Sequence, residues 1–267
     1  MNKLDDDKIK DLFFELKEIR DSIPKANNDI FTALRYINVS NSSEIENNII
    51  SPIFIQSALY RGNIKVKEHF SPIYRKIALE AISLDQLLRH LEKTINKNTD
   101  LSVSLLLKLH RILFDKSWPD IAGRFRDIDV RIRGVKLRPP HFSQVPPLMY
   151  QHLSWIDGIL KLLGPATKSN FFEIFHVSAD LHFRIIDTYP FRAGNWRVAR
   201  ALSDYVLLKS GLFYNTINPS KRNQYQSAIE NSSINDVSPL QEFLLLSYEE
   251  TLQHLSGFLN VIQQEKE

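Results

Sequence analysis

The sequence predicts a mainly helical protein with one small β-hairpin. Along most of the 267 residues, apolar side chains recur three and four positions apart, as they do on one face of a helix. One short stretch instead alternates apolar and polar side chains, which is typical of a strand. Proline or a capping residue stands beside several of the helical stretches. We therefore expect a helical protein that carries a single hairpin.

The first hundred residues are expected to contain three helices. The first spans residues 6–22, where apolar positions alternate with charged ones at helical spacing. A short helix follows at 29–36. A long third helix is expected from about residue 73 to residue 95. Ser71 precedes it as a cap, and Pro72 suits its first turn.

The middle of the chain contains two further helices and the strand signal. Residues 101–113 read as a helix, with Asp100 as its expected cap. Residues 127–135 alternate with a period of two, which predicts a strand. The apolar members are Ile128, Val130 and Ile132, and the polar members are Asp129, Arg131 and Arg133. A proline-rich stretch at 139–147 then precedes a helix at 148–163.

The last third of the chain is again helical. A helix is expected at 170–188, and residues 189–200 read as a loop that opens into the next helix. The last helix is expected from about residue 239 to residue 262. The helix after the loop is predicted by apolar residues at helical spacing: Val198, Leu202, Tyr205 and Val206.

Composition excludes several classes of protein. Hydrophobic residues make up 43% of the chain and charged residues 24%, which argues against extensive disorder. A net charge of +3 is too small to predict a nucleic-acid surface. Because the chain has no cysteine, it forms no disulfide and no thiolate metal site.

The amino terminus and the hydropathy pattern bear on location. The first residues are acidic and lead into an amphipathic helix, unlike a secretory signal. No apolar run approaches the ~20 residues that a membrane-spanning helix needs. We therefore expect a soluble, cytoplasmic protein without a membrane partner. A homo-oligomer is left open.

The loop at 189–200 has the features of an anion site. Gly194 and Asn195 fall at the start of a helix, where free backbone N–H groups and the positive end of the helix dipole favour an anion. Arg197 and Arg200 lie three residues apart and project from one helical face. Their planar guanidinium groups are suited to phosphate oxygens.

This segment is similar to the signature of the Fic (Fic/Doc, "Fido") family, His-Pro-Phe-x-Asp/Glu-Gly-Asn-Gly/Lys-Arg-x-x-Arg. The positions that match are Pro190, Phe191, Gly194, Asn195, Arg197 and Arg200. Three positions depart from it: Tyr189 stands at the catalytic His, Ala193 at the metal-binding acid, and Trp196 at Gly or Lys. The resemblance implies the Fic fold, a helical core with a small hairpin flap. It also implies transfer of AMP from ATP to a hydroxyl on a target protein.

The departures bear on the chemistry. A neutral imidazole with a pKa near ~6.5 is a base at pH 7, whereas a phenol with a pKa near ~10 is protonated and acts as a donor. For Tyr189 a structural or hydrogen-bonding role therefore stands beside a catalytic one. Ala193 offers no oxygen to Mg²⁺, and Asp187 either approaches a metal or ends the preceding helix. Trp196 either fills the phosphate approach or belongs to the core.

Two further segments resemble the same family. Ser42, Glu46 and Asn47 fit an inhibitory motif, Ser/Thr-x-x-x-Glu-Gly/Asn, whose Glu pairs with the second signature Arg, here Arg200. Residues 123–140 look like the flap that holds the target protein. Tyr225 resembles the aromatic residue beside the adenine, or else lies on a solvent-facing turn.

His176 and His182 lie six residues apart, unlike metal ligands on one helical face, and are expected to be core or surface residues. We expect an N-terminal region with the inhibitory-like motif over residues 1–100, a Fic core over 101–250 and the end of the C-terminal helix over 251–267. In the resulting hypothesis, a nucleotide such as ATP binds and AMP transfer is weak or lost. The alternatives are a nucleotide- or peptide-binding regulatory protein, and transfer of another phosphate-containing group, because relatives of this fold move phosphate or phosphocholine.

Overall fold

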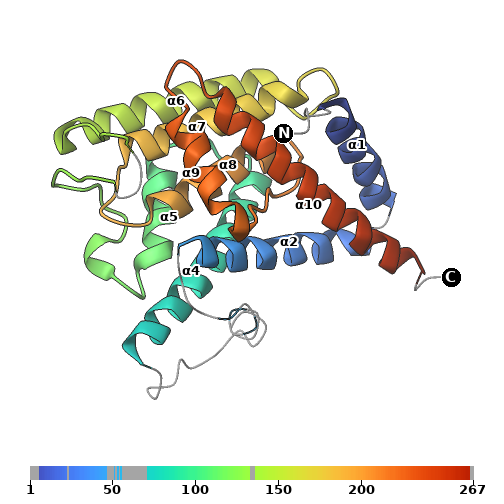
Figure 1. Ribbon diagram of the computed structural model, residues 1–267, viewed down its shortest axis with the longest axis horizontal. Coiled ribbons are helices and arrows are strands. Elements are labelled where there is room, and N and C mark those ends of the chain that lie inside the picture. The colour runs from blue at the N-terminus through green and yellow to red at the C-terminus, as the bar shows by residue number, and fades with distance from the viewer. Residues whose placement is uncertain are drawn as a thin grey trace.

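The computed structural model describes residues 6–22, 24–46, 51, 53, 55, 71–132 and 136–264. These residues form a bundle of helices (Figure 1). Its α-helices are α1 (Asp6–Ser22), α2 (Pro24–Ile45), α4 (Pro72–Asn96), α5 (Val103–Phe114), α6 (Val145–Leu163), α7 (Phe171–Thr188), α8 (Asn195–Lys209), α9 (Arg222–Glu230) and α10 (Ser238–Gln264). Three short 3₁₀ turns, Pro119–Ile121, Phe142–Gln144 and Pro219–Lys221, lie between them. The mainly helical prediction is confirmed.

The helices α7 and α8 form the centre of the bundle. They pack on each other more extensively than any other pair among the described residues, and α6 and α10 also contact α7. Most side chains of α7 are buried, and they include Phe175, Leu181 and Ile185. In Figure 1, α6 runs along the top of the bundle and α2 along the lower side, next to α4. The loop between α7 and α8 is therefore held between well-packed helices.

The helix α2 is longer than the short helix expected at 29–36. It continues to Ile45 through a stretch rich in asparagine and serine, residue types that weaken an isolated helix. Tertiary contacts account for the difference. Val39 and Ile45 are buried, and the side-chain amide of Asn38 donates to the buried carboxylate of Asp204 on α8 at 2.8 Å. Ser42 and Glu46 consequently lie at the end of a helix that is packed against the core.

The cap of α5 is Ser102 rather than Asp100. The Ser102 hydroxyl oxygen accepts the N–H of Leu105 at 3.2 Å. Asp100 instead pairs with Lys161 on α6 at 3.0 Å. Helix α5 begins at Val103, two residues later than expected, and a capping side chain must stand next to the first helical residue. The other expected helices differ from the observed ones by a few residues at their ends.

The expected strand and hairpin are not found among the described residues. The segments 127–132 and 136–140 contain no strand, and residues 133–135 lie outside the described part of the chain. Two features oppose backbone hydrogen bonding between paired strands here. Pro139 and Pro140 have no N–H to donate, and the Arg126 guanidinium takes the carbonyl oxygens of Ile128 and Pro140. The alternating sequence therefore gives an irregular segment, two of whose carbonyl oxygens bond to one side chain.

No helix of the described residues has both the length and the apolar character that crossing a bilayer requires.

Candidate functional site

The loop between α7 and α8 has a fixed backbone. It begins at Tyr189, where the chain leaves α7 with a φ of +48°, and ends at Gly194, with a φ of +78°. A Cβ atom on Gly194 would lie 2.4 Å from a ring carbon of Phe114. Only glycine both adopts this left-handed conformation easily and fits against the ring. The close approach of Phe114 therefore fixes where α8 begins.

Asn195 closes this loop. Its side-chain oxygen accepts the N–H of Phe191 at 2.9 Å, and its side-chain nitrogen donates to the Phe191 carbonyl at 2.8 Å. The side chain is completely buried. Because the amide already bonds to the loop through both of its polar atoms, Asn195 positions the loop. The donors left for an anion are backbone N–H groups at the start of α8, where no side chain of the described residues caps the helix.

His110 on α5 supports the loop from below, and sequence reasoning missed it. Its ring stacks on Phe191 with 3.7 Å between centroids and 7° between planes. One ring nitrogen, Nδ1, accepts the N–H of Gly123 at 3.0 Å, so the other, Nε2, carries the proton and donates to the Ala193 carbonyl at 3.1 Å. Burial lowers the pKa of His110 to about 4. The neutral imidazole therefore holds the loop at neutral pH.

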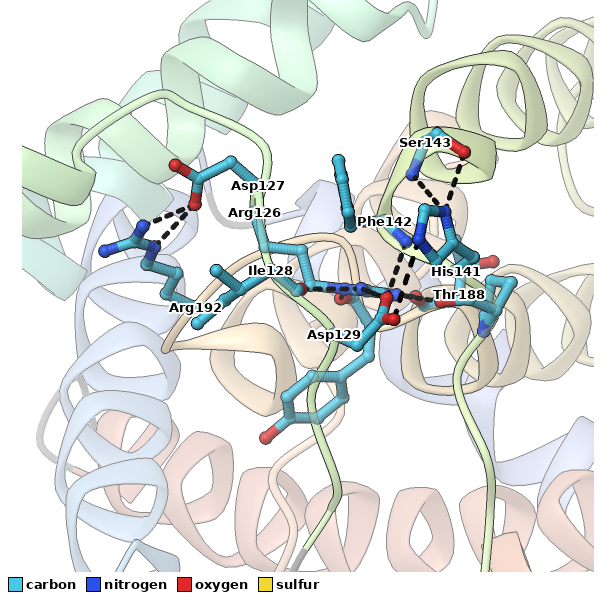
Figure 2. A network of polar contacts seen from close by, with 11 residues as sticks. Arg126, Asp127, Ile128, Asp129, His141, Phe142, Ser143, Thr188 and Arg192 are labelled. Atoms are coloured by element: carbon cyan, nitrogen blue, oxygen red, sulfur yellow. Dashed lines mark hydrogen bonds and ion pairs between the residues drawn. The ribbon is translucent and has the colours of Figure 1, made fainter.

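Arg126 is a second supporting residue that was not singled out from the sequence. Its side chain is wholly buried, and it lies beneath both the loop and the expected flap (Figure 2). The guanidinium donates to the carbonyl oxygens of Tyr189 at 2.8 Å, Ile128 at 2.9 Å, Pro140 at 2.5 Å and Thr188 at 3.4 Å. One buried cation thus joins the end of α7 to both sides of the flap segment.

Two acidic residues complete this network. Asp127 pairs with Arg192 of the loop, and the Asp129 carboxylate accepts the N–H of Phe142 at 2.9 Å (Figure 2). The hydrogen bond with Arg192 holds the pKa of Asp127 below its usual range. The flap segment is therefore anchored through Asp127, Arg126 and Asp129 in turn.

Tyr189 stands where the resemblance places a catalytic base. The residue is half-buried, and burial raises the pKa of its phenol, so the hydroxyl keeps its proton at neutral pH. It can donate a hydrogen bond but cannot take a proton from an attacking hydroxyl.

Ala193 provides no metal ligand at the neighbouring position. Burial also raises the pKa of Asp187, the nearest acidic residue before the loop in sequence. Among the described residues, no group of three or more histidine and acidic side chains is arranged to hold a metal ion. Position 193 therefore offers no side-chain oxygen to a Mg²⁺ ion.

Arg197 faces α4 rather than the start of α8. Its guanidinium donates to the carboxylate of Glu80 at 2.7 Å and lies over the ring of Phe114, 5.1 Å from the ring centre. Both side chains of the ion pair are nearly buried. Arg197 and Arg200 share the spacing predicted from sequence, but they are committed to different partners.

Arg200 meets the end of α2. Its guanidinium donates to the Ser42 hydroxyl at 2.8 Å and pairs with the Glu46 carboxylate at 2.9 Å. The predicted ion pair is therefore present. The remaining guanidinium nitrogen, Nη1, is buried and has no hydrogen-bond partner among the described residues. Asn47, the last residue of the inhibitory-like motif, lies outside the described residues.

Tyr225 is buried, which excludes the solvent-facing turn. Its hydroxyl shares a 2.6 Å hydrogen bond with Nε2 of His182, a core histidine whose pKa burial lowers to about 3. The half-buried Trp196 lies edge-on against Tyr225, with 5.5 Å between ring centroids. Trp196 thus packs on Tyr225 at the start of α8. His176, in contrast, lies on the surface beside Gln241.

The fold and this loop define a helical protein in which no side chain of the described residues caps the start of α8. Comparison with known proteins points to one family. The model of the Fic/DOC family matches residues 100–207, which include the loop, His110 and Arg126. Over this segment the chain is similar to the Fic/DOC family.

Curated relatives and solved structures agree with this assignment. The protein adenylyltransferases Fic of Aedes aegypti and Culex quinquefasciatus are each 25% identical over 174 residues, covering 65% of this chain. The chain spans about a third of the length of these relatives, 33% in both cases.

Among solved structures, a Fic domain containing signaling protein from Bacteroides thetaiotaomicron superposes with a TM-score of 0.78 at 20% identity, covering 92% of this chain and 94% of that one. Fic-1 from C. elegans gives 0.75 at 19%, covering 95% and 73%. At these identities the likeness is one of fold.

Proposed function

We propose that this protein binds a nucleotide on a Fic scaffold and transfers AMP from ATP to a protein hydroxyl very weakly or not at all. The observation that carries the proposal is the pair of residues in the loop. Tyr189 is a protonated phenol at the position of the base, and Ala193 has no oxygen at the position of the metal ligand. The backbone around them remains ordered by Gly194, Asn195 and His110.

The chemistry explains why the loss of these groups matters. In AMP transfer, the hydroxyl oxygen of the target bonds to the α-phosphorus while the bond to pyrophosphate breaks, and the hydroxyl proton must go to a base. A phenol that keeps its own proton cannot accept another. Loss of a general base costs about 10²–10⁴-fold in rate. The missing carboxylate also removes the direct protein ligand for Mg²⁺, which the family uses to neutralise phosphate charge.

The nucleotide contacts are assigned as follows. Backbone N–H groups at the start of α8 meet a phosphate, and Arg200 meets the outer phosphates through its unpartnered nitrogen. Arg197 contributes only if it leaves Glu80, so its role is to brace α8 against α4. Trp196 and Tyr225 flank the remaining part of the nucleotide.

The end of α2 is proposed to act as an internal brake. Ser42 and Glu46 occupy two of the Arg200 nitrogens, Nε and Nη2, that a phosphate would use. A phosphate must displace a carboxylate to reach them, because two anions next to each other repel. A target segment held at residues 130–140 and a cytoplasmic location belong to the same proposal.

A second candidate function is that of a nucleotide-binding regulatory protein without transfer. The observation that favours it is the link between Arg200 and α2, which is itself fixed to α8 by Asn38 and Asp204. Binding of an anion at Arg200 would release the end of α2, so occupancy alone could be the signal.

Two assays test these functions. Thermal unfolding with and without ATP tests nucleotide binding, because a ligand at ~100 times its Kd stabilises the folded state by about 2.7 kcal/mol. The matched variant is Arg200→Gln, which should make the shift smaller. Intact mass measurement after incubation with ATP and candidate targets tests transfer. We expect a thermal shift with little or no added AMP; absence of any shift would contradict both functions, and efficient AMP addition would contradict the first.

A further inference from the structure

A basic groove lies away from the loop, between the last turns of α4 and the first turns of α5. Its volume is about 400 Å³. Its lining includes four basic side chains and two hydroxyls: His90, Lys93, Lys97, Lys108, Ser102 and Ser104. None of these residues belongs to the signature, the flap or the inhibitory-like segment.

The positive charges of the groove are not neutralised. Among the described residues, none of the three lysines has an acidic partner within ion-pair distance. The carboxylates that neighbour the groove in sequence are already engaged, Glu92 by Arg35 at 2.8 Å and Asp100 by Lys161 at 3.0 Å.

The same charges act on His90. Its pKa is lowered first by burial and then by Lys108, Lys93 and Lys97, so all three ammonium groups act on one imidazole. The groove therefore has a positive potential that comes from two helices.

The helix dipole explains only part of this arrangement. Cations are favourable near the end of a helix, which accounts for Lys93 in the last turn of α4 and for Lys97 at its C-cap. It does not account for Lys108, which stands on α5 and faces the same groove. Lys93 and Lys97 are also four residues apart, a spacing at which like charges repel. The convergence of three lysines therefore costs stability unless an anion is present.

We propose that this groove binds a small soluble ligand with two or more adjacent phosphate groups. Compact ammonium charges on flexible stems suit several phosphates at once. The Ser102 oxygen accepts the N–H of Leu105, so its own proton is left to donate to a phosphate oxygen. The volume lies within the range of small-molecule sites. A nucleoside polyphosphate and an inositol polyphosphate share this chemistry.

The test is titration calorimetry with tripolyphosphate at low ionic strength, where electrostatic binding is strong. The triple variant Lys93→Gln, Lys97→Gln and Lys108→Gln removes the groove cations. The control triple variant, Lys76→Gln, Lys116→Gln and Lys168→Gln, removes the same charge elsewhere. We expect the groove variant to bind at least about tenfold more weakly and the control to change by less than about twofold. Equal weakening in both variants, or no saturable binding by the unchanged protein, would overturn the proposal.

Two further measurements separate this site from the loop. Arg200→Gln should leave the groove component of tripolyphosphate binding in place, whereas loss of all binding in that variant would place the ligand at α8 alone and refute the groove. In the unchanged protein, adding tripolyphosphate should shift the amide NMR signals of residues 90–108; a titration that moves signals of α8 but none of residues 90–108 would refute the groove without any variant. Parallel titrations with ATP and inositol hexakisphosphate distinguish the two ligand sources by which binds more tightly.

Discussion

Glu46, at the end of α2, forms an ion pair with Arg200 of α8 across 154 residues of sequence, with 2.9 Å between carboxylate oxygen and guanidinium nitrogen. The same guanidinium also bonds to Ser42. This contact joins the end of α2 to α8, at whose start we propose that a phosphate binds. The internal brake proposed above depends on it.

Replacing Glu46 by glycine should lower the free energy of unfolding of the nucleotide-free protein and strengthen nucleotide binding. Arg200 would lose a charged partner at a buried site, which costs about 1–3 kcal/mol of unfolding free energy. It would also become available to a phosphate, so the thermal shift with ATP should increase. Glu44→Gly is the matched control, because Glu44 is exposed on the same helix. Equal ATP shifts in both variants would show that Glu46 does not restrain the site.

Arg126→Ala should destabilise the protein by at least about 3 kcal/mol, because it leaves several carbonyl oxygens of the loop and the flap segment without their donor. Arg126→Lys should recover only part of the loss, since one ammonium cannot reproduce the planar fork. Arg192→Ala is the control: its pair with Asp127 is exposed, so its loss should have a much smaller effect on the free energy of unfolding. Urea unfolding measures all three. A cost for Arg126→Ala no larger than for the control would refute the supporting role.

Gly194→Ala should cost about 3 kcal/mol or more, because the new Cβ atom would meet the Phe114 ring in a backbone conformation that alanine adopts poorly. Gly158→Ala is the internal comparison. Gly158 lies within α6 with nothing within 4 Å of an added Cβ, so alanine there should stabilise by up to about 1 kcal/mol. We therefore predict that the free energy of unfolding falls in Gly194→Ala and rises in Gly158→Ala. Denaturation curves measure both changes.

His110 should make the protein less stable in acid. Its pKa in the folded state is about 4, below the ordinary 6.5, so the unfolded chain binds a proton that the folded protein excludes. Its contribution to the free energy of unfolding, about 3 kcal/mol, is complete above pH 6.5 and is lost as the pH falls from 6.5 towards 4. His110→Gln does not titrate and should show a flatter profile over that interval. A pKa near 6.5 for His110 by NMR would contradict this.

The helical fold was predictable because its signals are local. Apolar residues at helical spacing mark α5, α7 and α10 without any knowledge of their neighbours. The end of α2 was missed because it depends on a contact with a distant residue, Asp204. The cap of α5 was placed at Asp100, which instead pairs with the distant Lys161, while Ser102 caps the helix. The alternating segment at 127–132 misled for the same reason, because Arg126 takes carbonyl oxygens that a ladder would have used.

The site was predictable only where a family signature exists. The resemblance to the Fic signature and its inhibitory motif led to the pair of Arg200 and Glu46, which no local pattern could have joined. The same reasoning predicted that Arg197 and Arg200 bind phosphate together, whereas Arg197 pairs with Glu80 on α4, a helix far away in sequence. His110 and Arg126 carried no signal of their own: each looks like an ordinary residue of its segment until the fold places it beneath the loop.

The central claim is that the scaffold is intact and only the reactive groups are missing. Combining Tyr189→His, Ala193→Asp, Trp196→Gly and Glu46→Gly restores a base and a metal ligand, opens the phosphate approach and frees Arg200. Incorporation of AMP from ATP with Mg²⁺, measured by intact mass on the variant and on added proteins, should rise by about 10²–10⁴-fold over the unchanged protein. With Glu46 retained, the rise should be much smaller, and the effects should not add independently. A combined variant that folds but neither binds ATP nor gains AMP would contradict the account.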